Sequence, residues 1–243
     1  MSSAEKTRQD NQPAFVLHNY PFRETSLVLE VFTRGFGRIA LVARGARRPR
    51  SALRGVLLAF QPLLLSWAGK SELRTLHKAE WQGGVPQLKG SGLLCGFYVN
   101  ELLLKLLPRE DSHEELYSAY AAALRALAAG FDHSAVLRSF EKTLLKELGY
   151  ALLLHAEADS GIAIDPARRY EYVVERGPVA PRGAPSENGL KLSGQTLLDM
   201  ERDDFTNPLT QQESKALMRM LLNHYLGDQV LHTRQLLRDL QQL

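Results

Sequence analysis

The chain has 243 residues, 44% of them hydrophobic, which is enough to bury one large core or two smaller ones without disulfides or metals. It contains no run of about 18 uncharged apolar residues, and Met1 to Ala14 are mostly polar, so we expect neither a membrane span nor a signal peptide. The only cysteine, Cys95, cannot form an internal disulfide, and its apolar neighbours predict that it is buried. We therefore expect a cytoplasmic protein.

The overall charge of +3 conceals an asymmetry along the chain. Residues 1–90 contain 14 Lys or Arg and 6 Asp or Glu, whereas residues 91–243 contain 16 and 21. The first part therefore carries +8 and the second −5. Such an imbalance favours a polyanionic partner for the first part.

The first part of the chain has the pattern of a small β-domain. Five short runs rich in Val, Ile, Leu and Phe are separated by turn residues: Ala14–His18, Ser26–Thr33, Gly37–Ala43, Pro62–Ala68 and Leu73–Glu80. Because a sheet this small must close to avoid long free edges, we predict a five-stranded OB-type β-barrel over residues 14–85. Residues 1–13 are expected to form a disordered tail.

The pattern becomes helical after the barrel, so the predicted fold class is a multidomain α+β protein with a mainly α-helical domain over residues 90–243. Two Ser/Thr-x-x-Glu patterns, Ser112–Glu115 and Thr210–Glu213, predict helix starts with capping boxes. The last helix is expected from Thr233 to Leu243.

An irregular insert is expected at about residues 150–194. Within it, Tyr170–Val174 has the composition of a strand. The Pro- and Gly-rich stretch Gly177–Gly189 predicts a mobile loop.

The strongest local signal is a run of arginines without any acidic residue between the first and the last of them. Within 21 residues the chain contains Arg34, Arg38, Arg44, Arg47, Arg48, Arg50 and Arg54. Strand alternation places Arg38 and Arg44 on the face opposite Ile39 and Leu41. A planar guanidinium can bind phosphate oxygens or lie flat on a base, so we predict that these seven residues bind nucleic acid. The alternative is a solvated basic face near a strand end.

Three aromatic residues, Tyr20, Phe22 and Phe36, fall in turns near this run. Each could be a core residue or an exposed ring on which a base stacks. Phe36 is flanked by glycines at a turn tip, which makes it the better candidate for stacking, whereas Phe22 is expected in the core.

No pattern typical of catalysis or metal binding occurs. A lone cysteine excludes zinc sites built on two or four thiolates, and the histidines lack the spacing of a metal-binding helix. The chain also lacks a nucleophile elbow, a Walker loop and a dinucleotide-binding fingerprint. We expect a non-enzymatic protein with no metal and no cofactor.

A basic stripe is expected on the helix predicted from Ala135 to Leu148. Arg138, Lys142 and Lys146 recur every four residues beside apolar positions that include Leu144. A groove with an apolar floor and a cationic rim suits an acidic peptide that ends in a hydrophobic residue. An ordinary amphipathic helix, in which nearby glutamates balance these charges, is the alternative.

Several segments together resemble the RecO family of bacterial recombination mediators. In family order they are Ala14–His18, Arg23–Leu27, Gly37–Arg38, Ala43–Arg48, Pro62–Leu65, Gly96–Leu104, Leu106–Asp111, Leu137–Glu141, Glu147–Tyr150, Asp165–Pro166 and Tyr225–Asp228. This resemblance covers the chain from Ala14 to Leu243.

The resemblance implies a protein of DNA repair and homologous recombination that binds single- and double-stranded DNA and anneals complementary strands. It implies action with RecR, and possibly RecF, to load RecA onto DNA coated by the single-strand binding protein SSB, in the nucleoid. It also implies binding of the acidic, Phe-terminated tail of SSB to the basic-rimmed groove. Arg138 would bind the tail carboxylate, and Lys142 and Leu144 would line the groove.

One departure from the family concerns zinc. Many members carry four zinc-binding cysteines before the C-terminal helices, but here the segment from His155 to Gly161 contains none. The chain therefore resembles the branch without zinc, and we expect packing and hydrogen bonds to hold this segment.

Other classes of function stay open on the residues alone. An RNA-binding OB-fold module without a repair role would share every basic feature. A hydrolase with an unrecognised site and a purely structural adaptor are the remaining alternatives.

Overall fold

The computed structural model describes residues 8–181 and 189–240, with side chains up to residue 236. The chain divides into two compact units. Unit 1 contains Met1–Gly130 and Leu231–Leu243, and unit 2 contains Phe131–Val230. No helix among the described residues is long and apolar enough to cross a membrane.

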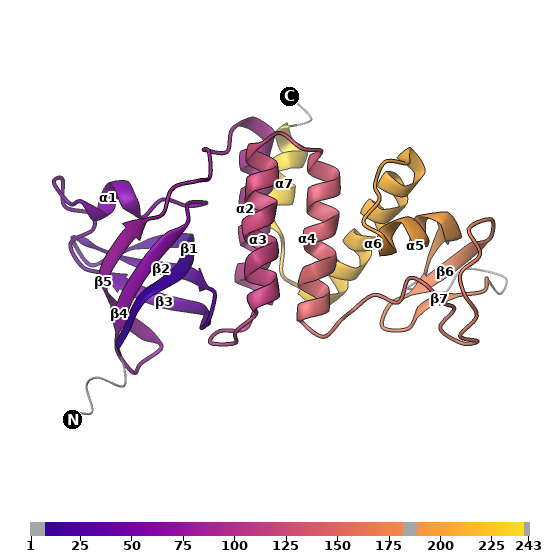
Figure 1. The fold of residues 1–243 in the computed structure, drawn as a ribbon, viewed down its shortest axis with the longest axis horizontal. Coiled ribbons are helices and arrows are strands. Elements are labelled where there is room, and N and C mark those ends of the chain that lie inside the picture. Colours follow the sequence, from indigo (N-terminus) through magenta and orange to yellow (C-terminus); the bar gives the residue numbers. More distant parts are fainter. Residues whose placement is uncertain (1–7, 182–188, 241–243) are drawn as a thin grey trace. The chain divides into compact units, whose positions relative to one another are not determined.

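Five strands of unit 1 form a closed barrel in the order β1-β2-β3-β5-β4, which confirms the predicted architecture (Figure 1). The strands are β1 (Arg8–Phe22), β2 (Ser26–Thr33), β3 (Gly37–Ala43), β4 (Leu63–Ala68) and β5 (Leu73–Trp81). One short helix, α1 (Leu53–Val56), lies between β3 and β4. Alternate strand residues, including Val31, Ile39, Leu41, Leu65 and Trp67, point inward and are buried in the barrel core.

The first strand begins earlier than expected. Residues 8–13, predicted to be part of a disordered tail, belong to β1, because Arg8, Gln9 and Gln12 pair with residues of β4. This pairing satisfies the backbone of a polar segment whose side chains gave no strand signal. Residues 1–7 of the predicted tail lie outside the described residues.

Part of the outer barrel surface is covered by helices of the same unit. Phe15 and Phe32 point outward, yet they are buried because the rings of Tyr117 and Tyr120 pack on them with centroids 5.0–6.0 Å apart. Besides α1, the described helices of unit 1 are α2 (Gly90–Leu106), α3 (Glu114–Ala128) and α7 (His232–Leu240). This aromatic packing groups α3 with the barrel, although the sequence pattern placed the division near residue 90.

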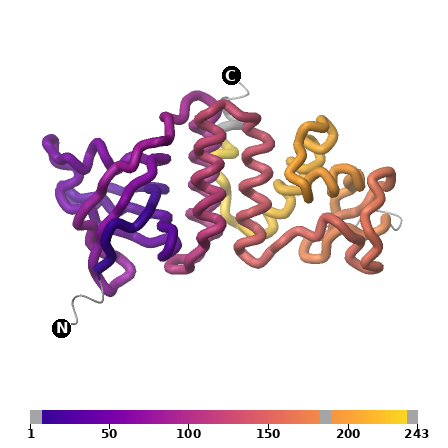
Figure 2. Tube along the Cα trace, viewed as in Figure 1, coloured from indigo at the N-terminus to yellow at the C-terminus, as the bar shows by residue number. Residues whose placement is uncertain are grey.

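The C-terminal helix packs on α2, so the end of the chain returns to unit 1 (Figure 2). The Glu101 carboxylate accepts hydrogen bonds from the backbone N–H groups of His232 and Thr233 and from the Thr233 hydroxyl. It thereby occupies the donors that a helix start leaves free. Cys95 of α2 is buried, as predicted.

The start of α3 differs from the prediction. The helix begins at Glu114, and no side chain caps it. The Ser112 hydroxyl instead donates to the backbone oxygen of Arg34. The predicted capping box at Ser112–Glu115 is therefore wrong, because the Ser112 hydroxyl is hydrogen-bonded to the β2–β3 hairpin instead of to the helix start.

Unit 2 combines three helices with a small antiparallel sheet of order β7-β6-β8. Its elements are α4 (His133–Glu147), β6 (Arg169–Val173), β7 (Gly177–Val179), β8 (Gly189–Ser193), α5 (Gly194–Glu201) and α6 (Pro208–Leu226). The strand predicted at Tyr170–Val174 corresponds to β6. The loop predicted at Gly177–Gly189 is wrong at its ends, because both ends pair with β6, and residues 182–188 lie outside the described residues.

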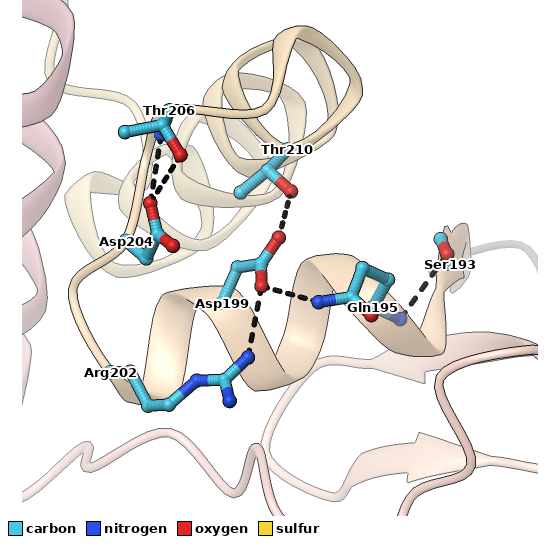
Figure 3. Close-up of polar contacts among 7 residues, drawn as sticks. All are labelled: Ser193, Gln195, Asp199, Arg202, Asp204, Thr206 and Thr210. Carbon is cyan, nitrogen blue, oxygen red and sulfur yellow. Dashed lines mark hydrogen bonds and ion pairs between the residues drawn. The ribbon is translucent and has the colours of Figure 1, made fainter.

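A polar network joins α5 to α6 (Figure 3). The Asp199 carboxylate accepts from Thr210 Oγ1 at 2.7 Å and from Gln195 Nε2 at 2.6 Å. Glu213 accepts from the Ser193 N–H and the Thr196 hydroxyl. Both members of the second predicted capping box are thus engaged with α5, and α6 begins at Pro208 with Asn207 as its N-cap.

Candidate nucleic-acid interface

Strand directions define two ends of the barrel. Both β2 and β4 run antiparallel to β1, and β3 and β5 run parallel to each other. The last residues of β1, β3 and β5 therefore share one end with α1, which we call the α1 end. The tip of the β2–β3 hairpin, Arg34–Phe36, lies at the opposite end, which we call the hairpin end.

Five of the seven predicted arginines lie at the α1 end, in the segment from Arg44 to Arg54 that leaves β3 and enters α1. We call this segment the arginine loop. Its exposed arginines are Arg44, Arg47, Arg48, Arg50 and Arg54. The structure thus brings together most of the predicted site.

The backbone of the arginine loop is fixed, although its cationic side chains are exposed. Ala46 is buried in the barrel core, and Leu53 packs against the same core from α1. The Arg47 N–H donates to the backbone oxygen of Thr25 at 2.9 Å, and its guanidinium donates to the backbone oxygens of Arg23 and Glu24. These contacts tie the loop to the β1–β2 turn and limit the entropy lost when a ligand binds.

No carboxylate among the described residues forms an ion pair with the five arginines of the loop. Within the described part of the chain, no carboxylate therefore neutralises their charges. A cluster of one sign gains free energy from an anionic partner, since binding removes the repulsion within it.

The other two arginines of the predicted site lie at the hairpin end and are already paired. Arg34 Nε is 3.0 Å from Glu114 Oε2 of α3. Arg38 Nε donates to the Leu107 oxygen at 3.0 Å, and its Nη1 is 3.3 Å from Glu30 Oε2. We therefore correct the prediction that all seven arginines form one surface.

Glu30 and Arg38 belong to a largely buried ion cluster with Arg109. Glu30 is only 5% exposed and accepts from both arginines. Burial lowers the pKa of Arg38, while the charge of Glu30 opposes that change. The cluster joins the barrel to the segment between α2 and α3, which is a structural role.

Phe36, the residue predicted to stack on a base, is less exposed than expected. The Phe36 ring is half-buried against the barrel core, and its centroid lies 5.4 Å from that of Trp67 in an edge-on arrangement. The ring lies at the hairpin end, away from the arginine loop. It is partly buried because packing on the apolar core is more favourable than exposure to water. Sequence reasoning missed Trp81, the last residue of β5, which is 60% exposed at the α1 end.

The basic stripe predicted on α4 is engaged within unit 2. Arg138 is 7% exposed and its guanidinium donates to Glu141. Lys142 Nζ donates to the Met200 oxygen at 2.6 Å and lies 2.8 Å from Asp203 Oδ1. Leu144 is fully buried, so it does not line an open groove. The arrangement matches the amphipathic-helix alternative more closely than an open peptide site.

Backbone hydrogen bonds hold the segment that begins at His155, for which the sequence predicted packing and hydrogen bonds. The Glu157 N–H donates to the Ile162 oxygen, and the Ile164 N–H donates to the His155 oxygen. Within the part of the chain that the structure describes, no group of three or more His, Cys, Asp or Glu side chains is placed to hold a metal ion.

A closed five-stranded barrel with a cluster of exposed arginines at one end defines the class: a protein built on an OB-type barrel, followed by helices. The chain belongs to the RecO family, because the profile of the Recombination protein O N terminal region matches residues 8–84 and that of its C terminal region matches residues 88–235. This family places the chain among proteins of DNA repair and recombination.

Individual relatives agree with the profiles. The chain is 58% identical over 241 residues to a protein named DNA repair protein RecO from Nitrosospira multiformis, with 99% of this chain and 100% of the relative covered. It is 56% identical to the protein of the same name from Aromatoleum aromaticum over 99% and 100% of the two chains. It is 55% identical to that from Dechloromonas aromatica over 98% and 99%.

Proposed function

We propose that this chain is a recombination mediator that binds single- and double-stranded DNA through the arginine loop and anneals complementary strands. The observation that carries the proposal is the group of five exposed arginines on a fixed backbone, which have no carboxylate partner among the residues that the structure describes. Neutralising the phosphates of two strands lowers the repulsion that slows their pairing. No covalent step is required.

The partners that we propose follow from membership of the family. Together with RecR, and in some organisms RecF, the chain would help to load RecA onto SSB-coated DNA. Binding of the acidic SSB tail to α4 would recruit it there, with Arg138 as the residue to test. Because Arg138 already donates to Glu141, a tail carboxylate must compete with that glutamate.

Salt dependence of single-strand binding tests the electrostatic proposal. If about four phosphates are neutralised, the slope of log K against log salt should approach roughly −3, from about −0.7 for each contact. Fluorescence anisotropy of a labelled oligonucleotide at several salt concentrations measures it. A slope near zero contradicts the proposal. Competition between RNA and DNA oligonucleotides of the same length tests the alternative of an RNA-binding module.

Annealing of SSB-coated complementary oligonucleotides tests the recruitment proposal. The chain should accelerate annealing, and Arg138→Ala should slow it on SSB-coated strands but not on bare strands. Arg219→Ala, which changes an exposed arginine of α6, is the control. Thermal unfolding of both variants shows whether a loss reflects misfolding, and equal slowing on bare DNA would contradict a role in SSB binding.

A further inference from the structure

The two tryptophans of the chain lie in opposite environments on neighbouring strands. Trp67 of β4 is 1% exposed in the barrel core, whereas Trp81 of β5 is 60% exposed. Tryptophan is rarely left this exposed in a folded domain, because its ring has a large apolar area. The exposure of Trp81 therefore requires an explanation.

The register of the barrel explains how Trp81 comes to lie at its mouth. Trp81 pairs with Leu63, a core residue, and shares the strand parity of Ala79, which packs on the core. Its side chain thus belongs to the inward face of β5 but stands at the last residue, where the barrel ends.

The indole is held in place, and its faces are left open. Trp81 Nε1 donates to Gln61 Oε1 at 3.0 Å, and Gln61 itself is buried. Gly83 lies beside the ring, where a Cβ would come within 3.8 Å of Cζ2. Among the residues that the structure describes, no aromatic ring or guanidinium stacks on Trp81.

Trp81 and the arginine loop share the α1 end of the barrel. Pairing of β3 with β5 stops at Val42 and Thr75, so the rest of β5 extends beyond it. Helix α1, in which the arginine loop ends, contacts β5 and contains Arg54. Cationic side chains and an open aromatic ring are therefore available to one ligand.

We propose that Trp81 stacks on an unpaired base of a single strand whose phosphates bind the arginine loop. This inference rests on the proposed function, since it presumes DNA at the loop. A single strand fits both features, because every base has an apolar face and every linkage carries a charge. Duplex DNA offers only the charge, since its bases are already stacked.

Stacking on Trp81 therefore gives the chain a preference for single strands over duplex DNA, which the arginines alone do not provide. Stacking on one aromatic ring corresponds to roughly 5- to 150-fold in affinity. Gln61 acts as a positioning residue, because it fixes the orientation of the indole.

Tryptophan fluorescence tests the contact directly. Titration of the wild-type chain with a poly-dT oligonucleotide should quench its emission, and Trp81→Phe should abolish that quenching, because the buried Trp67 is then the remaining tryptophan. Quenching that persists unchanged in Trp81→Phe would overturn the proposal.

Anisotropy of labelled oligonucleotides separates this inference from the proposed function. Trp81→Ala should weaken single-strand binding about tenfold or more while duplex binding is retained. Phe131→Ala, which removes an exposed aromatic ring of unit 2, should change neither. If wild type binds with the expected salt dependence and Trp81→Ala binds single strands equally well, the stacking inference fails alone. If wild type does not bind, the proposed function fails as well.

Discussion

The two ends of the barrel use the same kind of side chain for opposite purposes. At the hairpin end, Arg34 and Arg38 are paired with Glu114 and Glu30. At the α1 end, the arginines of the loop have no carboxylate partner among the described residues. The arginines at the first end form ion pairs that help to join the barrel to the helices of unit 1. The arginines at the second end are available to bind a ligand.

This difference shows that a basic run in a sequence is not one functional unit. The run from Arg34 to Arg54 passes from one end of the barrel to the other along β3, and each end has different neighbours. Glu30 and Glu114 lie outside the run, so their contribution depends on the fold. An acid-free stretch of sequence therefore need not form an acid-free surface.

The largest effect is expected when the buried ion cluster of the hairpin end is broken. Glu30→Gln leaves the guanidinium of Arg38, which is largely buried, without its carboxylate, and should lower the free energy of unfolding by about 3 kcal/mol. Urea unfolding followed by circular dichroism measures the change. Binding of DNA by the folded variant should be unchanged, because the arginine loop keeps its charge.

The exposed pair at the same end provides the control. Glu114→Gln removes the partner of Arg34, but both side chains are mostly exposed, so we expect a loss of at most about 1 kcal/mol. Equal losses in the two variants would contradict the assignment of Glu30 to a buried structural cluster.

A loss of similar size is expected from Gly37→Ala at the base of the hairpin. Gly37 has φ of +62°, and a Cβ there would lie 1.8 Å from the backbone oxygen of Asp111. The left-handed conformation alone costs an alanine about 1 to 3 kcal/mol, and the clash with a backbone atom adds to it, so we expect a loss of about 3 kcal/mol in urea unfolding. Gly35→Ala, where the added Cβ meets open space, should be nearly neutral. A neutral Gly37→Ala would mean that the hairpin does not pack closely against Asp111.

The α1 end should show the reverse behaviour. Arg47→Ala combined with Arg48→Ala should weaken DNA binding roughly tenfold and reduce the salt slope by about 1.4, since two phosphate contacts are lost. Anisotropy titrations at several salt concentrations measure both quantities. The melting temperature should fall only slightly, because the bonds that the Arg47 guanidinium donates to Arg23 and Glu24 are exposed and its backbone bond to Thr25 remains. A large loss of stability with unchanged DNA affinity would assign the loop a structural role.

Much of the fold could be predicted because its determinants are local. Strand periodicity from Ser26 to Ala43 and the spacing of apolar residues on α2 and α4 follow directly from the sequence. The polar start of β1 could not be predicted in this way, since it is held by backbone pairing with β4 rather than by apolar side chains.

The candidate site could be predicted only in part, for a related reason. The cationic residues of the arginine loop were visible, because turn residues after β3 are exposed in most folds. The pairing of Arg38 and the burial of Phe36 depend on residues distant in sequence, namely Glu30 across a hairpin and Trp67 on β4. Trp81 is the first residue after the predicted strand Leu73–Glu80. The two glycines that follow it, Gly83 and Gly84, have no side chains that could cover its ring, and they were the feature of the sequence that indicated its exposure.

The smallest effect is expected for a carboxylate that is paired with backbone donors rather than with guanidinium groups. Burial acts to raise the pKa of Glu101, but hydrogen bonds from Thr233 and His232 outweigh it and hold this pKa below its ordinary value. A lowered pKa means that the stabilisation is present above the unfolded pKa of about 4.3 and is lost as the pH falls through the folded value. Acidification below that unfolded pKa should therefore progressively weaken the attachment of α7 to α2.

Hydrogen exchange of the α7 amides measures that release. Wild type should lose protection of α7 at low pH before the barrel strands do, and Glu101→Ala should show the weaker protection already at neutral pH. In contrast to the Glu30 cluster, where loss of the charge leaves the largely buried guanidinium of Arg38 without its carboxylate, loss of Glu101 exposes only helix-start N–H groups that water can satisfy. A drop in barrel stability as large as that of Glu30→Gln would show that α7 supports the barrel itself.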